Sequence, residues 1–260
     1  MAIQLYDYQL EALNRMKNGC ILCGGVGSGK SRTGLAYYYV QEGGKVGTDE
    51  YIPMKNPRDL YIITTARKRD TWEWQRDLAP ILLPPTPEAN YYKNKVVIDS
   101  WNNIGKYVDV KDAFFIFDEQ RVVGYGAWTK AFLKIVKSND WLLLSATPGD
   151  TWQDYIPVFI ANGFYRNKTD FVDQHVIYDW RAKYPKVDGY RNTGRLIRLR
   201  DRILVNMDFK RQTVSHHEDI RVSYDISRYK DIMRTRWNPW EDRPIETAAE
   251  LCMALRRVTN

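Results

Sequence analysis

Short apolar segments alternate with segments of helical spacing through the first 150 residues of this chain. The apolar segments are CILC at 20–23, LYIITT at 60–65, KVVIDS at 95–100, AFFIFDE at 113–119 and WLLLSAT at 141–147. Strands that are apolar on both faces are typical of parallel sheets, in which helices form the crossovers and cover both sides. The sequence therefore predicts an α/β fold: a mostly parallel, twisted sheet with helices on both faces.

The alternation ends near residue 160, and this divides the chain into three predicted parts. Residues 1–160 carry the alternating pattern, 161–225 form a less regular basic extension that completes this first domain, and 226–260 contain one or two helices interrupted by WNPWEDRP. Within the extension, the run IRLRDRILVNM at 197–207 has the composition of a strand. We therefore expect a sheet domain followed by a mixed, partly helical C-terminal extension.

The composition excludes several classes of protein. Hydrophobic residues make up 44% of the 260 residues, which is enough for a buried core and excludes global disorder. No run approaches the roughly 18 apolar residues of a membrane span, and the N-terminus lacks the pattern of a secretory signal. Three cysteines and three histidines build neither a disulfide scaffold nor a zinc site, so Cys20 and Cys23 are expected to pack in the core. We expect a soluble, cytoplasmic protein.

Positive charge is concentrated in one segment. The chain has 39 Lys+Arg and 32 Asp+Glu, a net charge of +7, and residues 181–211 contain ten basic and three acidic side chains. Such a concentration attracts polyanions, nucleic acids first among them. A solvated basic face is the alternative, and the charge alone does not distinguish the two.

The sequence GGVGSGKS at 24–31 has the G-x-x-x-x-G-K-[ST] spacing of a phosphate-binding loop and lies between a predicted strand and a predicted helix. Glycines allow successive backbone N–H groups to face phosphate oxygens, and the helix N-terminus adds the positive end of its dipole. Lys30 is expected to reach the β- and γ-phosphates, and the Ser31 hydroxyl to bind Mg²⁺. The predicted nucleotide contacts are Gly25, Val26, Gly27, Ser28, Gly29, Lys30, Ser31 and Arg32.

Two further strands end in polar side chains at the edge where the phosphate loop is expected. Asp118 and Glu119 end AFFIFDE, and Ser145 and Thr147 lie at the end of WLLLSAT. Asp118 is predicted to hold Mg²⁺, and Glu119 to orient and deprotonate the attacking water. Ser145 and Thr147 are predicted to couple the acidic pair to its surroundings by hydrogen bonds. The predicted catalytic residues are thus Lys30, Asp118 and Glu119.

These motifs, in this order, resemble those of superfamily-two helicases and translocases, especially the Swi/Snf-type branch. The glycine loop is similar to motif I, FDEQ at 117–120 to motif II and SATP at 145–148 to motif III. Weaker elements extend the resemblance. Tyr8-Gln9 is similar to the glutamine element that reads adenine in this family. YIITTARKRDTWEW at 61–74 is similar to motif Ia, and VIDSW at 97–101 is similar to motif Ib. The amino-acid sequence as a whole also resembles those of helicases found in bacteriophage genomes.

The resemblance implies a RecA-like lobe that binds ATP and Mg²⁺ and couples ATP hydrolysis to movement on DNA. It places Gln9 at the adenine, and Arg67, Lys68 and Ser100 at the sugar-phosphate backbone of DNA, with RNA as an open alternative. A phage-encoded protein of this kind would act in the cytoplasm of a bacterial host. Motif II reads Asp-Glu-Gln-Arg here, and its third and fourth residues differ from those common in the family. Phosphate chemistry needs only the first two residues, so we expect the difference to affect the coupling of hydrolysis to movement more than hydrolysis itself.

Motors of this family use a second lobe, which supplies an arginine finger. No second strand-helix alternation follows residue 160, and NTGRLIR at 192–198 lies too close to SATP to be the final arginine motif. The chain is therefore expected to be a first lobe with a linker that binds ATP and hydrolyses it slowly. The alternative function is a nucleic-acid-binding module that keeps the nucleotide pocket as a switch, has no motor activity, and uses residues 181–211 as its working surface.

Overall fold

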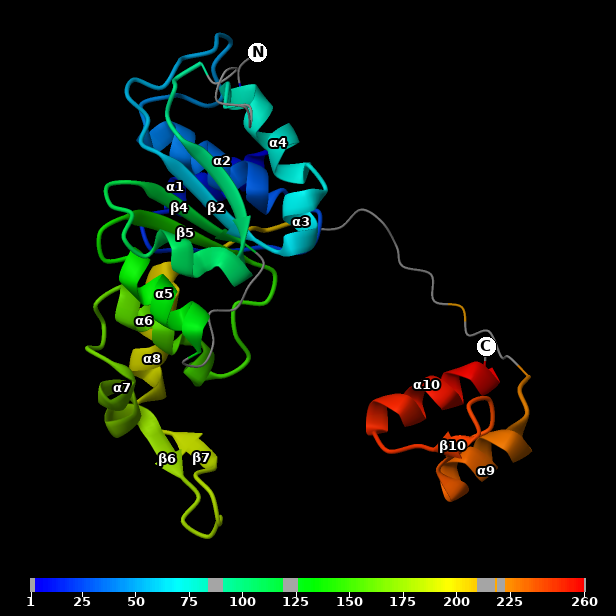
Figure 1. The fold of residues 1–260 in the computed structure, drawn as a ribbon. Coiled ribbons are helices and arrows are strands. Elements are labelled where there is room, and N and C mark those ends of the chain that lie inside the picture. Colours follow the sequence, from blue (N-terminus) through cyan, green and yellow to red (C-terminus); the bar gives the residue numbers. More distant parts are fainter. Residues whose placement is uncertain (1–2, 84–90, 119–125, 210–217, 219–222, 260) are drawn as a thin grey trace. The chain divides into compact units, whose positions relative to one another are not determined.

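The computed structural model describes residues 3–83, 91–118, 126–209, 218 and 223–259 (Figure 1). The chain divides into two compact units, Met1–Lys210 and Arg211–Asn260, and each has its own hydrophobic cluster or clusters. Within the described residues, no helix combines the length and the apolar character that a membrane crossing requires.

The larger unit is built on a six-stranded sheet in which all neighbouring strands are parallel. In order across the sheet, the strands are β3 (Val96–Ser100), β2 (Leu60–Thr64), β4 (Phe114–Asp118), β5 (Asp140–Ser145), β1 (Ile21–Cys23) and β8 (Leu204–Asn206). The five apolar segments of the sequence are thus β1 to β5, and the predicted parallel α/β fold is confirmed. The sixth strand, β8, comes from the basic extension and pairs with β1.

Helices connect the strands. The α-helices of this unit are α1 (Asp7–Arg15), α2 (Lys30–Gln41), α3 (Ala66–Asp70), α4 (Glu73–Leu78), α5 (Ala127–Ile135), α6 (Ile156–Ala161), α7 (Lys168–His175) and α8 (Thr193–Ile203). Short 3-10 helices span η1 (Ala79–Ile81), η2 (Trp101–Tyr107) and η3 (Trp152–Tyr155). An antiparallel hairpin of β6 (Val176–Tyr178) and β7 (Val187–Tyr190) lies between α7 and α8.

Successive residues of each strand pack on opposite faces of the sheet. In β4, Phe114 and Ile116 belong to one hydrophobic cluster, Phe115 and Phe117 belong to the other, and all four are fully buried. The first cluster includes side chains of α1, α2 and α4, and the second includes side chains of η2 and of α5 to α8. Figure 1 shows these helices around the sheet. Because helices cover both faces, β4 is apolar at its first four positions and polar only where it ends.

The parallel arrangement places the loops that follow β1 to β5 at a single edge of the sheet. The register aligns the ends of the strands, because Cys23 pairs with Ser145 and Thr64 with Ser100. Asp118, the last residue of β4, pairs with Leu144 of β5. The glycine loop, motif Ia and the acidic motif therefore start from neighbouring positions, although many residues separate them in the sequence.

The basic extension differs from the prediction in one element. The run at 197–207 was expected to be a strand, but its first part belongs to α8 and only Leu204–Asn206 is extended. Leu196 and Ile203, seven residues apart, are both fully buried in the second cluster, which is the spacing of one helix face. Packing of this face overrides the strand-like composition.

The smaller unit contains α9 (Ile226–Thr235), β9 (Trp237–Asn238), β10 (Arg243–Pro244) and α10 (Ala248–Thr259). The two helices agree with the expected helices on either side of WNPWEDRP, and the turn forms the short β9–β10 pair. Ile232 packs with Leu251 and Ala254, and the Trp240 ring lies beneath the Arg228 and Arg257 guanidinium groups.

Phe132 of α5 provides a test of the second core. The side chain is fully buried and meets Phe117 and Trp141 edge to face. Phe132→Ala should lower the free energy of unfolding by about 3–5 kcal/mol, because it removes buried area and leaves a cavity. Urea unfolding measures the loss. Trp128→Ala, which changes an exposed position of the same helix, should cost clearly less; equal costs would contradict the packing described here.

Candidate functional site

The loop between β1 and α2 has the backbone that its glycines predict. Gly27 and Gly29 have φ values of 83° and 76°, a region that residues with a Cβ rarely adopt. A side chain at position 29 would also collide with the Gln9 amide. α2 begins at Lys30, so its first N–H groups and the positive end of its dipole lie at the loop.

The Lys30 ammonium lies against the loop from which it starts. Its Nζ donates hydrogen bonds to the carbonyl oxygens of Gly24 (2.7 Å) and Gly25 (3.0 Å). The cation is thus held inside the curve of the loop, where an anion bound by the backbone N–H groups would meet it.

The carboxylate of Asp118 is the most buried charge of the site. Only 1% of its side chain is exposed, and its Oδ2 accepts hydrogen bonds from Lys68 Nζ (2.8 Å) and Thr64 Oγ1 (2.8 Å). The backbone carbonyl of Asp118 accepts a hydrogen bond from the Trp101 indole (3.0 Å). The carboxylate is therefore held by Thr64, which ends the neighbouring strand β2, and by Lys68, which follows it.

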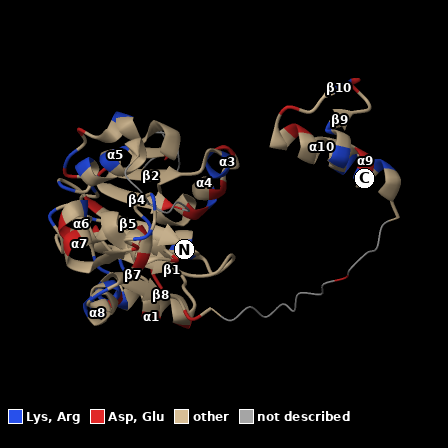
Figure 2. Cartoon of the chain, turned by 90° about the horizontal axis from the view of Figure 1, so that it is seen from below, with Lys and Arg blue, Asp and Glu red and all other residues tan. Residues whose placement is uncertain are grey.

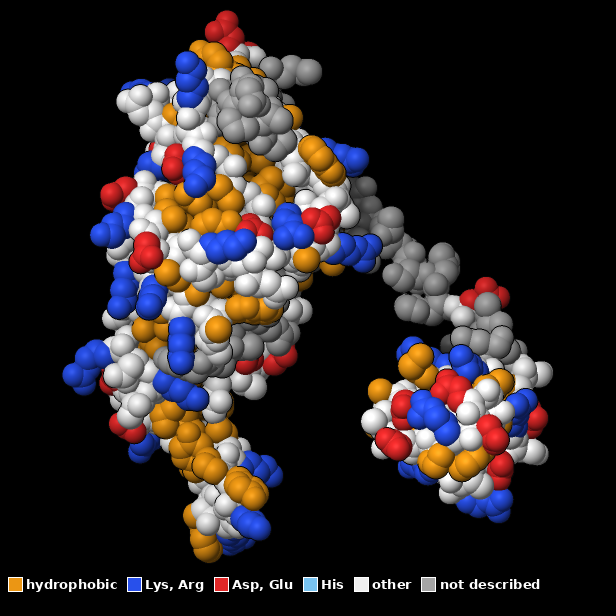
Figure 3. All heavy atoms as spheres, in the orientation of Figure 1, with side chains coloured by type: hydrophobic (Ala, Val, Ile, Leu, Met, Phe, Trp, Pro, Cys, Tyr) orange, Lys and Arg blue, Asp and Glu red, His pale blue; other side chains and the backbone are white. Residues whose placement is uncertain are grey.

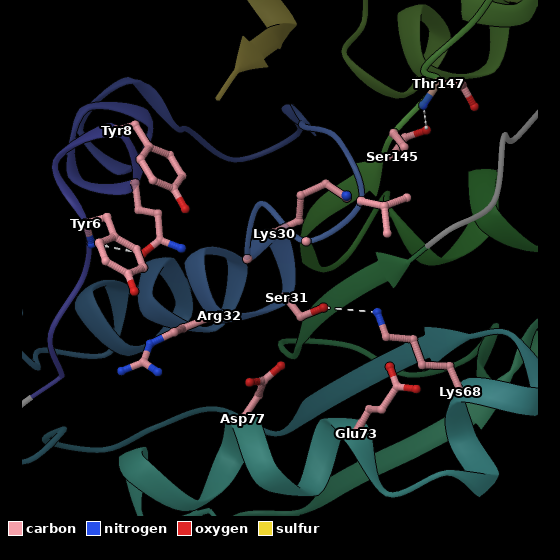
Figure 4. A pocket seen from close by; sticks show the side chains of 15 residues that line it. Tyr6, Tyr8, Lys30, Ser31, Arg32, Lys68, Glu73, Asp77, Ser145 and Thr147 are labelled. Atoms are coloured by element: carbon pink, nitrogen blue, oxygen red, sulfur yellow. Dashed lines mark hydrogen bonds between the residues drawn. The ribbon is translucent and has the colours of Figure 1, made fainter. Parts of the chain in front are cut away.

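Lys68 joins the acidic motif to the phosphate loop. The same Nζ that contacts Asp118 also donates to the Ser31 hydroxyl (3.0 Å; Figure 4). It lies 5.0 Å from the centre of the Trp74 ring. The Lys68 side chain is only 13% exposed. The two oxygen atoms predicted to bind a metal ion therefore converge on a single cationic centre, which is an ammonium group here.

A cavity of about 630 Å³ opens beside this centre, with the phosphate loop on one side and α3 and α4 on the other (Figure 4). Its size is that of a small-molecule site. Arg32 of α2 and Asp77 of α4 both line it. Burial raises the pKa of Asp77 above its usual range, while the cations of Lys68 and Arg32 act in the opposite direction.

Tyr6, Tyr8 and Gln9 form another wall of the cavity. The two tyrosine rings are stacked, with centroids 5.7 Å apart. The buried Gln9 accepts a hydrogen bond from the Tyr6 N–H (3.0 Å) and donates to the Ser28 carbonyl (3.2 Å), to which the Tyr8 hydroxyl also donates (3.3 Å). The predicted glutamine element thus supports the phosphate loop directly.

Other predicted residues lie around the same edge. Ser145 is buried at the end of β5, and its hydroxyl accepts a hydrogen bond from the Thr147 N–H (3.1 Å). Both residues line the cavity. Glu119, the predicted base, lies outside the described residues.

The three predicted nucleic-acid contacts have different surroundings. Arg67 is exposed on α3, Ser100 is buried at the end of β3, and the ammonium of Lys68 faces the Ser31–Asp118 pair. Their contact with nucleic acid stays a prediction.

Sequence reasoning missed several residues of the site. Tyr6 and Asp77 line the cavity, and Thr64 bonds the acidic motif. Thr64 and Asp77 could have been identified from sequence, because each is a polar residue near the end of a predicted element. Nothing in the local sequence indicates that the Lys68 side chain turns toward Asp118.

The cysteines do not form a metal site. Among the described residues, no group of three His, Cys, Asp or Glu side chains is arranged to hold a metal ion. Cys20 is buried in the first core cluster, and burial raises the pKa of its thiol to about 11. The expectation that Cys20 packs in the core is confirmed; Cys23 is half-buried at the end of β1.

Comparisons with solved structures identify the fold. The Sulfolobus solfataricus SWI2/SNF2 ATPase core in complex with dsDNA is similar to this chain, with a TM-score of 0.56 and 12% identity over 79% of this chain and 45% of that chain. The Pyrococcus furiosus Hef helicase domain matches with a TM-score of 0.41 and 16% identity, over 66% of this chain and 40% of that chain. No protein-family model and no curated protein matches the sequence.

The first of these likenesses concerns the fold alone. This chain has a RecA-like lobe fold: a parallel sheet covered by helices, with the glycine loop after β1. It spans less than half the length of either solved structure.

The contact between Lys68 and Asp118 predicts the effect of removing the cation. Lys68→Met should lower the free energy of unfolding by about 2–4 kcal/mol in a chelator-containing buffer without nucleotide, because a buried carboxylate loses its counter-ion. Urea unfolding is the measurement. Adding Asp118→Asn should recover part of the loss, since it removes the uncompensated charge.

Arg69→Met is the matched control for this pair. Arg69 lies on the same short helix and pairs with Asp70 and Asp99 near the surface, so its removal should change stability much less. If Lys68→Met and Arg69→Met behave alike, the buried pair is not the interaction that stabilises this edge.

Proposed function

We propose that this chain is the ATP-binding lobe of an ATP-dependent DNA helicase or translocase. One observation carries the proposal: the Ser31 hydroxyl of the phosphate loop and the Asp118 carboxylate lie on either side of one cation, Lys68 Nζ, at 3.0 and 2.8 Å. A phosphate loop and a strand-end carboxylate at this separation can act on a single phosphate group.

The proposed chemistry at the phosphates is positioning and charge compensation. The backbone N–H groups of the loop and the N-terminus of α2 would hold the phosphate oxygens. Lys30 would leave its carbonyl partners and contact the outer phosphates. Because phosphoryl transfer needs little covalent chemistry from the protein, these groups suffice for binding and for most of the electrostatic stabilisation.

Ser31 in the first turn of α2 and Asp118 at the end of β4 suit Mg²⁺. It prefers oxygen ligands and keeps several waters, and Ser31 and Asp118 offer one hydroxyl and one carboxylate that already converge on a cation. When bound, Mg²⁺ would neutralise charge on the phosphates. Lys68 would then have to leave its present position, because the metal ion and the ammonium would use the same two oxygen atoms.

The rest of the nucleotide would extend along the cavity toward Tyr6, Tyr8 and Gln9. The stacked tyrosine rings offer an apolar surface for a purine, and the resemblance to the helicase glutamine element assigns Gln9 to adenine. Glu119 is proposed as the residue that orients the attacking water, on the same resemblance.

The DNA-binding part of the proposal rests on the fold and on charge. The similar Sulfolobus solfataricus ATPase core is described in complex with dsDNA. In this chain, the exposed Arg67 follows β2 at the edge of the sheet that carries the phosphate loop. Strand separation and movement on duplex DNA are both compatible with these residues, and coupling would pass through Ser145 and Thr147.

The alternative, a nucleic-acid-binding module with a nucleotide switch, is favoured by the basic segment 181–211. The two functions differ in one measurement. With an ATP analogue present, a nucleotide-induced change in DNA affinity that is lost in Lys30→Ala supports the motor lobe. Salt-dependent DNA affinity that Lys30→Ala leaves unaffected under the same conditions supports the module.

Nucleotide binding tests the site directly. Lys30→Ala should weaken binding of a fluorescent ATP analogue by about tenfold to a hundredfold, because a charge-assisted contact to phosphate is lost. Lys106→Ala, an exposed lysine on η2, should bind as the unchanged chain does. DNA-stimulated ATP turnover of this chain should stay below about 1 s⁻¹, because none of the residues proposed for the site is an arginine finger; faster turnover would contradict this prediction.

The competition between Lys68 and Mg²⁺ predicts a change in metal dependence. Lys68→Met should reduce the Mg²⁺ concentration needed for half-maximal nucleotide binding several-fold, because the competing ammonium is gone. Titration of the ATP analogue at fixed concentration with Mg²⁺ measures this value, with Arg69→Met as the control. A higher Mg²⁺ requirement in Lys68→Met would show that Lys68 supports the nucleotide instead.

A further inference from the structure

The hairpin β6–β7 carries a cluster of exposed aromatic and basic side chains at its end. Residues 180–186, WRAKYPK, connect the two strands and are called the aromatic–basic tip here. Trp180 is 83% exposed and Tyr184 is 73% exposed. Single exposed aromatic residues are common on protein surfaces. Here two large exposed rings lie within five residues of each other, at the end of a projecting hairpin, where they contribute little to the core.

The base of the hairpin is firmly held. His175, the last residue of α7, is fully buried; its Nε2 shares a hydrogen bond with the Tyr165 hydroxyl (2.7 Å) and its Nδ1 one with the Arg191 carbonyl (3.0 Å). The strand pairing continues beyond β6 through the Asp179 N–H, which donates to the Lys186 carbonyl (2.8 Å). The tip is therefore presented from a fixed base.

The charge of the tip has one sign. Arg181, Lys183 and Lys186 lie within it, and none of its seven residues is acidic. The Arg181 guanidinium lies 4.9 Å from the Trp180 ring centre, and the Lys183 ammonium lies 5.8 Å from the Tyr184 ring centre. Each exposed ring is thus accompanied by a cation, an arrangement that suits a ligand with both flat aromatic faces and negative charge.

The basic surface continues into the next helix. α8 begins three residues after β7, and Arg195, Arg198 and Arg202 line a shallow cavity on it. In Figure 2 the ribbon of α8 is blue where its Arg residues lie, and Figure 3 shows apolar and basic side chains together at the free end of the hairpin. The part of the chain with the largest excess of positive charge therefore carries its most exposed aromatic rings.

We propose that the aromatic–basic tip binds single-stranded DNA: unpaired bases stack on its two rings, and the phosphates between them contact its three cations. Stacking requires bases that are not enclosed in a duplex, and it is tolerant of sequence. An acidic protein segment would satisfy the cations but not the flat ring faces. The choice of DNA as the nucleic acid rests on the proposed function, whereas the contacts themselves need neither ATP nor Mg²⁺.

The test compares DNA binding by variants that lose the two aromatic rings with binding by variants that keep an aromatic ring at both positions. The double variant Trp180→Ala/Tyr184→Ala should bind a labelled oligothymidylate of about 20 nucleotides at least tenfold more weakly, since each stacked base contributes roughly fivefold to 150-fold. Trp180→Phe/Tyr184→Phe should retain most of the binding. Fluorescence anisotropy without nucleotide measures the binding. Tyr91→Ala is the surface control, because Tyr91 is 67% exposed and lies outside the hairpin.

Charge removal provides a second, independent measurement. Replacing Arg181, Lys183 and Lys186 by glutamine should lower the slope of log affinity against log salt by about 2, since each contact with single-stranded phosphate contributes roughly 0.7. Neither set of substitutions should alter urea unfolding, because the tip is exposed. Lys30→Ala should lose nucleotide binding but keep the binding of oligothymidylate that is measured without nucleotide. The proposed nucleotide site and the proposed DNA-binding tip are therefore tested independently of each other.

Three results would overturn the proposal. The first is unchanged oligothymidylate binding in the alanine double variant. The second is an equal loss of binding to a duplex of the same length, which would assign the tip to double-stranded DNA. The third is competition by poly-glutamate as effective as that by unlabelled oligothymidylate, which would show that charge alone is recognised.

Discussion

The ion pair between Asp118 and Lys68 is the interaction on which the arrangement of the site depends. A carboxylate that is 1% exposed is stable only with a compensating cation and hydrogen bonds, and here these come from the residues that end and follow β2. Because Lys68 also contacts Ser31, the same cation links the phosphate loop after β1 to the carboxylate at the end of β4. Three chain segments that are distant in sequence are thus held at one edge.

The parallel sheet makes this convergence possible. Its central strands β2 and β4 are buried on both faces, so much of the apolar surface that stabilises the core lies away from the loops at the carboxyl edge. Those loops can therefore carry glycines with positive φ, a buried charge and a large cavity without weakening the core. The hairpin β6–β7 extends the same principle, since a base held by His175 presents a tip that has no part in the core.

Much of the site could be predicted from sequence because each motif adjoins a recognisable strand. The glycine loop follows β1, and Asp118 ends β4, as expected. The prediction of a strand was wrong for residues 197–203, where burial of Leu196 and Ile203 on one face produces a helix, and was confirmed for Leu204–Asn206. It also did not anticipate that Lys68 turns into the site, because the direction of a long, flexible side chain depends on neighbours that come from other strands.

The sequence by itself determined the succession of strands β1 to β5 along the chain, the glycine loop and the positions of the acidic and hydroxyl residues at strand ends. Local spacing and backbone preference are enough for these features. Only the tertiary structure decided which of these groups share a centre, which cation neutralises the buried carboxylate, and which aromatic rings stay outside the core. These outcomes depend on distances between segments far apart in the chain, which follow from strand order and packing rather than from local sequence.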